Sequence, residues 1–147
     1  MANVIEVLKR DHRKVDMLFE QIDDTNDAAK RLRIFNDLAA ELDGHANAEE
    51  TVVYPRAAKK EETRDLANHS YKEHDDIRDG IDKVESMNTV GTDWIDQVKE
   101  LRKVVRHHVS EEEKNFFPKL EKAFSASELE EMAYLVERSK ERLSQAV

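Results

Sequence analysis

The sequence predicts an all-α protein, an up-down-up-down four-helix bundle with an additional C-terminal helix. Lys, Glu, Asp, Leu and Ala dominate its 147 residues, which include only three glycines and two prolines. Apolar side chains recur three and four positions apart over long stretches, the period of an amphipathic helix. We therefore expect residues 1–147 to form a single domain, with the bundle at about 3–122 and the extra helix at about 127–144.

The first helix is expected over residues 3–23, where apolar residues and one histidine form a continuous seam. Turn-forming residues at 24–27 separate it from the second helix, which starts near Asp27 and reaches Pro55. That proline should kink or end the helix, because it lacks a backbone N–H and clashes with the preceding turn.

The third helix is expected over residues 63–87, and the loop at 88–93 contains a glycine and residues suited to capping. The fourth helix covers about 94–117 and again meets a proline, Pro118. Ser127-Glu-Leu-Glu130 has the pattern of a capping box and announces the fifth helix, which continues to about Ser144. Short connections imply antiparallel neighbours, with the fifth helix packed outside the bundle.

Composition and charge exclude several classes of function. The formal net charge is -9 and there is no basic stripe, so we expect no nucleic-acid partner. The absence of cysteine excludes disulfides, thiolate chemistry and Cys-ligated metal sites. The N-terminal stretch is charged rather than apolar, and no segment approaches the roughly 18–20 apolar residues that span a bilayer. We expect a cytoplasmic protein with no membrane partner.

An internal repeat is the most informative feature. His45-Ala-Asn-Ala-Glu49 is followed by Tyr54-Pro55, and His108-Val-Ser-Glu-Glu112 is followed by Phe117-Pro118, with an offset of 63 (108 − 45). A shift of 62 places Asp11-His12 on Glu73-His74. Each half thus has an acidic-His pair on one helix and His-x-x-x-Glu on the next.

These residue types at this spacing suit metal ions. A His and a Glu four positions apart share one helix face, imidazole binds first-row transition metals, and carboxylates bridge pairs of cations. One such histidine alone is usually a hydrogen-bonded core residue, and one His-x-x-x-Glu is usually a surface pair. Because the pattern occurs twice in register, we predict a two-metal site with vacant positions, unlike a closed structural zinc site. Its ligands are predicted to be His12, His45, Glu49, His74, His108 and Glu112.

Other polar residues are interpreted separately. His107 breaks the repeat and His69 lies off the helix face, so both are predicted to be at the surface. Glu50 and Glu113 repeat, but about 100° further round the helix, where they are surface charges or partners that orient a ligand. Tyr54 is a core aromatic residue like its counterpart Phe117, or its phenol approaches the metals.

The order, the spacing and the two prolines resemble the hemerythrin-like, HHE cation-binding domain over roughly residues 4–122, in particular its bacterial stand-alone members. The resemblance implies a four-helix bundle with two non-haem iron ions, bridged by an oxo or hydroxo oxygen and by carboxylates. By position, His12 and His45 would each bind iron, Glu49 and Glu112 would be the bridges, and His74 and His108 would complete the ligands.

The chain departs from the oxygen-carrying hemerythrins at two points. Their third helix carries His-x-x-x-His, whereas Ser70 and Arg78 flank His74 here, and Glu113 stands where they have an aspartate. A missing histidine weakens the unequal coordination that suits reversible oxygen binding. The leading hypothesis is therefore a reaction with dioxygen or peroxide, with catalase- or peroxidase-like turnover in oxidative-stress defence. The alternatives are oxygen storage, sensing of iron, oxygen or nitric oxide, a site for manganese or zinc, and a bundle that binds no metal.

Overall fold

The computed structural model describes residues 2–145, and these form only helices and the turns that join them. This confirms the predicted all-α class. Met1, Ala146 and Val147, which belong to the predicted single domain, lie outside the described residues. None of the described helices is both long enough and apolar enough to cross a bilayer.

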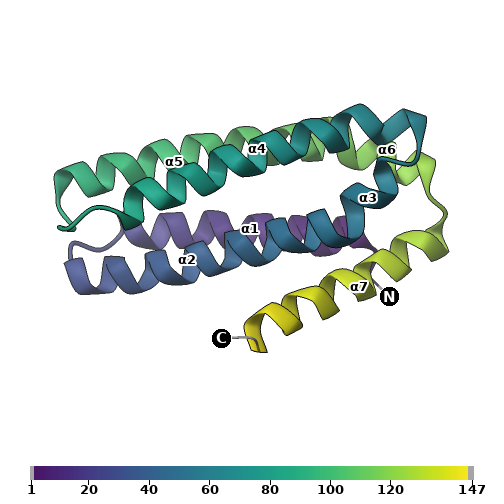
Figure 1. The fold of residues 1–147 in the computed structure, drawn as a ribbon. Coiled ribbons are helices and arrows are strands. Elements are labelled where there is room, and N and C mark those ends of the chain that lie inside the picture. Colours follow the sequence, from purple (N-terminus) through teal and green to yellow (C-terminus); the bar gives the residue numbers. More distant parts are fainter. Residues whose placement is uncertain (1, 146–147) are drawn as a thin grey trace.

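Four long helices form the bundle: α1 (Val4–Asp23), α2 (Ala28–Ala48), α4 (Glu61–Glu85) and α5 (Thr92–Glu111). Figure 1 shows α1 beside α2 and α4 beside α5, with consecutive helices running in opposite directions. The first two helices start where the sequence predicts, because the side chains of Asn3 and Asp27 accept hydrogen bonds from backbone N–H groups in the first turn.

The two prolines do not end their helices. Helix α2 passes into the π-helical turn η1 (Glu49–Val53) and continues as α3 (Tyr54–Ala57). Helix α5 passes into η2 (Glu112–Phe116) and continues as α6 (Phe117–Ala123). Each proline lies in the first turn of the short helix that follows, where a missing N–H is tolerated. In Figure 1 α3 turns away from the direction of α2.

The last helix, α7 (Ala126–Gln145), packs on the outside of α1 and α2, as expected. The capping box assigned to Ser127 and Glu130 was wrong. Ser125 and Glu128 form it instead: the Glu128 N–H donates to Ser125 Oγ at 3.1 Å, and the Ser125 N–H donates to Glu128 Oε1 at 2.9 Å. Both serines have a glutamate three residues later, so sequence alone did not separate them.

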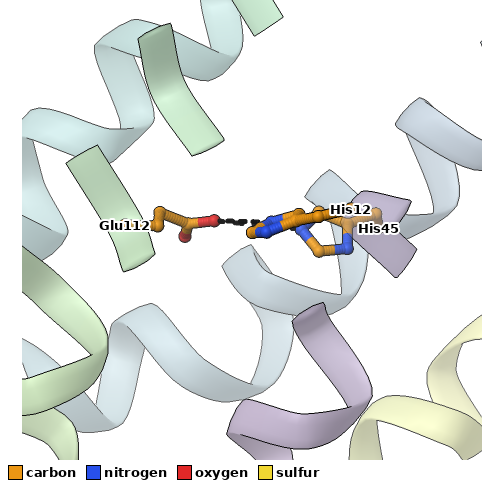
Figure 2. Close-up of side chains that lie close together, drawn as sticks. All are labelled: His12, His45 and Glu112. Carbon is orange, nitrogen blue, oxygen red and sulfur yellow. Dashed lines mark hydrogen bonds and ion pairs between the residues drawn. The ribbon is translucent and has the colours of Figure 1, made fainter. Parts of the chain in front are cut away.

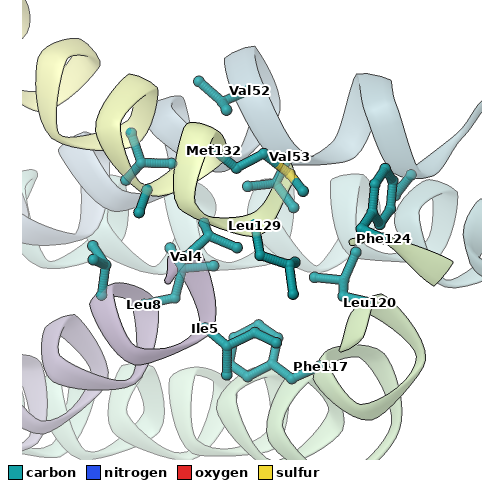
Figure 3. Close-up of a cluster of buried hydrophobic side chains, with 14 of the residues drawn as sticks. Val4, Ile5, Leu8, Val52, Val53, Phe117, Leu120, Phe124, Leu129 and Met132 are labelled. Carbon is teal, nitrogen blue, oxygen red and sulfur yellow. The ribbon is translucent and has the colours of Figure 1, made fainter. Parts of the chain in front are cut away.

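Two apolar clusters occupy the interior. One joins the start of α1 to η1, α6 and α7, and Figure 3 shows α7 covering it with Leu129 and Met132. The other fills the opposite end of the bundle around Phe35 and Trp94. Between them the core is interrupted by a layer of buried polar side chains, which centres on four histidines. Buried charges are costly unless they are paired or bind metals, so this layer marks the functional site.

Candidate metal centre

All six predicted ligands lie in this polar layer, and each is buried. They form two groups of donor atoms, and the atoms within each group lie within 4.8 Å of one another. One group is His12, His45 and Glu112, and the other is Glu49, His74 and His108. Figure 2 shows the first group, with Glu112 pointing across the bundle at His12. The residues of the internal repeat thus form two groups, each with two histidines and one glutamate.

The two glutamates lie between the groups. Glu112 Oε1 is 3.1 Å from His12 Nε2 and 3.4 Å from His108 Nε2. Glu49 Oε1 is 3.0 Å from His45 Nε2 and 3.2 Å from His74 Nε2. Each carboxylate therefore faces one histidine from each group, which is the arrangement that bridging carboxylates require.

Each histidine has a second carboxylate behind it, next to its Nδ1 atom. The four pairs are His12–Glu113 at 2.7 Å, His45–Asp11 at 3.0 Å, His74–Glu50 at 2.6 Å and His108–Glu73 at 2.8 Å. These contacts favour an N–H on the outward Nδ1, which leaves the lone pair of Nε2 pointing inward. The four imidazoles are thus oriented with Nε2 toward the centre, as metal ligands would be.

Sequence reasoning missed two of these supporting carboxylates, Asp11 and Glu73. The available signal was the acidic residue directly before a histidine in both halves. For Glu50 and Glu113 the sequence left two interpretations open, and the structure shows that both orient a histidine. The π-helical turns explain how, because successive side chains diverge less in a wide turn than in an α-helix. Neighbouring glutamates can then both reach the interior layer.

The unmet bonding capacity in the layer fits metal ions. Glu49 Oε2 is buried and has no hydrogen-bond partner among the described residues, and His45 Nε2 also lacks a hydrogen bond although it lies 3.0 Å from Glu49 Oε1. Burial by itself lowers the pKa of His45, but the charge of Glu49 and the bond with Asp11 raise that pKa well above its ordinary value. Four imidazoles and two central carboxylates match the donor preference of first-row divalent ions.

Comparison with known proteins identifies the family. The family described as the hemerythrin HHE cation binding domain matches residues 3–120. The chain belongs to the hemerythrin HHE family.

The chain is also similar to two curated relatives and one solved structure. An uncharacterized hemerythrin-like protein of Schizosaccharomyces pombe is 32% identical over 142 residues, covering 95% of this chain and 70% of that protein. A DNA nickase of Nostoc sp. is 27% identical over 146 residues, covering 97% of this chain but 40% of the nickase. The crystal structure of an HHE domain-containing protein from Mycobacterium kansasii shares the fold with a TM-score of 0.86 at 23% identity, covering 99% of this chain and 90% of that one.

Tyr54 makes the two halves of this HHE domain chemically different. Its hydroxyl donates to Glu112 Oε2 at 2.8 Å and lies 3.1 Å from His74 Nε2. Burial and the charges of Glu112 and Glu49 raise the pKa of the phenol well above its usual value, so it remains a donor. The counterpart Phe117 has no hydroxyl and stacks on His12, with ring centroids 5.8 Å apart. Of the two central carboxylates, only that of Glu112 therefore receives a phenol hydrogen bond among the described residues.

A small void of about 20 Å³ adjoins the four histidines of the HHE domain. Apolar side chains make up the rest of its wall, including Val15, Val105 and Val109. The same three valines also line a surface cleft of about 680 Å³ between α1 and α5. The void and the cleft share only these three valines and His12 as lining residues, so these side chains separate the centre from the cleft.

Proposed function

We propose that this chain is a non-haem di-iron protein that reacts with dioxygen or peroxide, with catalase- or peroxidase-like turnover as its activity. The observation that carries the proposal is a pair of His₂Glu groups beside a void large enough only for a small molecule. Bound iron would supply the redox chemistry that disproportionates peroxide into oxygen and water, or that reduces dioxygen or peroxide with electrons from an added donor. The proposal includes a cytoplasmic location.

The side chains of this domain would hold and shield the reacting centre. The four supporting carboxylates keep the imidazoles in one tautomer, so that metal binding needs no rearrangement of the rings. The Tyr54 hydroxyl presents a buried proton next to Glu112. The apolar wall of the void excludes bulk water, which strengthens polar interactions inside it.

The small ligand would enter between α1 and α5. Val109 is half-buried there, whereas its counterpart Ala46 on α2 is buried. On the other side of the bundle, between α2 and α4, Arg78 forms an ion pair with Glu50 at 2.9 Å.

We expect Val109→Phe to slow azide binding to the iron-loaded protein and to leave the affinity for azide little changed. Val104→Phe adds the same bulk on another face of α5 and should have no effect; equal rates in both variants would refute this route.

Metal quantification with a visible spectrum, followed by an oxygen electrode, tests the proposal. The wild type should bind about two iron ions and evolve oxygen from peroxide. His45→Ala and His108→Ala should lose both properties, and His107→Ala, which removes an exposed neighbour, should keep them. Turnover would be refuted if the iron-loaded protein evolved no oxygen from peroxide and also consumed no oxygen in the presence of a reductant. A stable, reversible oxygen adduct would favour oxygen storage instead.

Our proposal does not extend the activity named for the Nostoc relative to this chain. The match covers 40% of that protein, and the chain carries a net charge of -9. A protein that contacts several phosphates by charge needs clustered Lys and Arg side chains. Binding of small oxygen species requires no such surface.

A further inference from the structure

The geometry points to a second cation site, on the surface where α4 meets α5. We propose that His69, Glu73 and His107 bind one divalent first-row transition metal ion. This site adjoins the buried centre through Glu73, and its two histidines are the two that take no part in that centre.

The buried carboxylate of Glu73 supplies the key observation. Its Oε1 atom accepts a hydrogen bond from His108 Nδ1 at 2.8 Å, as part of the central layer. Its Oε2 atom is also buried but has no hydrogen-bond partner among the described residues. Glu73 is only 6% exposed, so an unpartnered charged oxygen here is costly unless a cation meets it.

Two imidazoles approach this free oxygen. His69 Nε2 lies 3.5 Å from Glu73 Oε2, and His107 Nε2 lies 3.4 Å from the same atom. The three residues line a surface hollow of about 360 Å³. His69 is one helical turn before Glu73 on α4, and His107 comes from α5, so the donors approach from two helices.

The internal repeat shows what occupies the same place in the other half. Asp11, the counterpart of Glu73, has both carboxylate oxygens contacted by the Lys140 ammonium of α7, at 2.8 and 2.9 Å. Gly44 stands at the position of His107 and leaves room for α7, whose Leu143 lies 3.8 Å from a Cβ added there. In the second half, no lysine or arginine among the described residues forms an ion pair with Glu73. A metal ion would supply the charge that Lys140 supplies in the first half.

The donor set selects the class of cation. Two imidazoles and one carboxylate favour zinc and its first-row neighbours over calcium or magnesium, which prefer oxygen ligands. Three protein ligands leave one position for water. Both histidines are more than half exposed, at 56% and 67%, so their rings can turn until each nitrogen is about 2.0–2.1 Å from the ion. The net charge of -9 attracts cations to the protein.

Zinc titration of the full chain tests the proposal. The wild type and a His69→Gln/His107→Gln double variant are dialysed against buffered Zn²⁺ and analysed for metal. Wild type should bind one equivalent more than the double variant, and His69→Gln alone should weaken binding at this site by more than about tenfold. Lys103→Gln alters the same hollow without removing a donor, so its zinc affinity should not fall.

A second measurement separates this site from the buried centre. Zinc should shift the ring resonances of His69 and His107 in NMR spectra, and it should still do so in His45→Ala, which damages only the centre. Loss of iron binding by the centre would therefore leave this proposal standing. Equal zinc content in wild type and the double variant, or ring resonances of both histidines unmoved by zinc, would overturn it.

Discussion

Lys140→Met tests whether α7 helps to support the metal centre. The Lys140 ammonium contacts both carboxylate oxygens of Asp11, and the same carboxylate lies 3.0 Å from His45 Nδ1. Methionine keeps an apolar side chain of similar length but removes the charge. The substitution therefore isolates one ion pair that connects α7 to a predicted ligand.

The expected loss follows from the burial of the pair. Asp11 is 8% exposed in its side chain and Lys140 is 23% exposed, so solvent screens this pair poorly. A hydrogen bond to a charged group contributes about 1.5–3 kcal/mol, and removing the lysine leaves a buried carboxylate with one partner fewer. We expect the free energy of unfolding to fall by about 2 kcal/mol, and the melting temperature by roughly 4–8 °C for a chain of this size.

Urea denaturation of the metal-free protein measures this loss, and the chain offers a matched control. Arg10 and Glu137 join the same two helices at 3.1 Å, but their side chains are 61% and 44% exposed. Arg10→Met should therefore cost less than about 1 kcal/mol. Equal losses for Arg10→Met and Lys140→Met would refute the reasoning. Weaker support for His45 should also lower metal affinity by about 10–100-fold in Lys140→Met, and not in Arg10→Met.

Three further changes have defined outcomes. Gly80→Ala places a Cβ 2.8 Å from Leu101 Cδ1 in the core, so overpacking should outweigh the gain in helix propensity and destabilise the protein by about 1 kcal/mol. Gly44→Ala meets no such contact and should stabilise the protein by a similar amount. Thermal melts of both variants measure these changes. Tyr54→Phe should lower the free energy of unfolding of the metal-free protein by about 1–3 kcal/mol in urea titrations, because Glu112 Oε2 loses its donor; an unchanged midpoint would contradict the hydrogen bond. Loading iron should raise the melting temperature markedly, because cations compensate the buried carboxylates; identical calorimetric scans with and without iron would count against the centre.

The sequence could predict the bundle and the six candidate ligands in the central layer, because both follow from spacing along single helices. The four-residue separation of His45 from Glu49, repeated at 108 and 112, places two donors on one face wherever that helix packs. Repetition of the pattern then distinguished it from ordinary surface pairs. Those six residues do converge in the structure, in two groups.

The remaining features depend on contacts between helices, which spacing does not specify. Asp11 and Glu73 support histidines that lie 34 and 35 residues away along the chain. Ser125 and not Ser127 is the cap, and the sequence does not separate them because both have a glutamate three residues later. His69 and His107 looked unrelated in the sequence because one lies on α4 and the other on α5.

The crossed distribution of donors makes the two halves of the chain dependent on each other. His12 and His74 each face the central glutamate of the other half, at 3.1 and 3.2 Å, whereas His45 and His108 lie nearer to the glutamate of their own half. A metal ion bound at the centre would therefore also stabilise the association of the helix pair α1–α2 with the helix pair α4–α5. If the chain were cut in the turn at residues 58–60, each fragment would keep two histidines and one glutamate but would lose the carboxylate that reaches across from the other half. The two fragments would have to reassemble to rebuild either group, and added metal would strengthen their complementation.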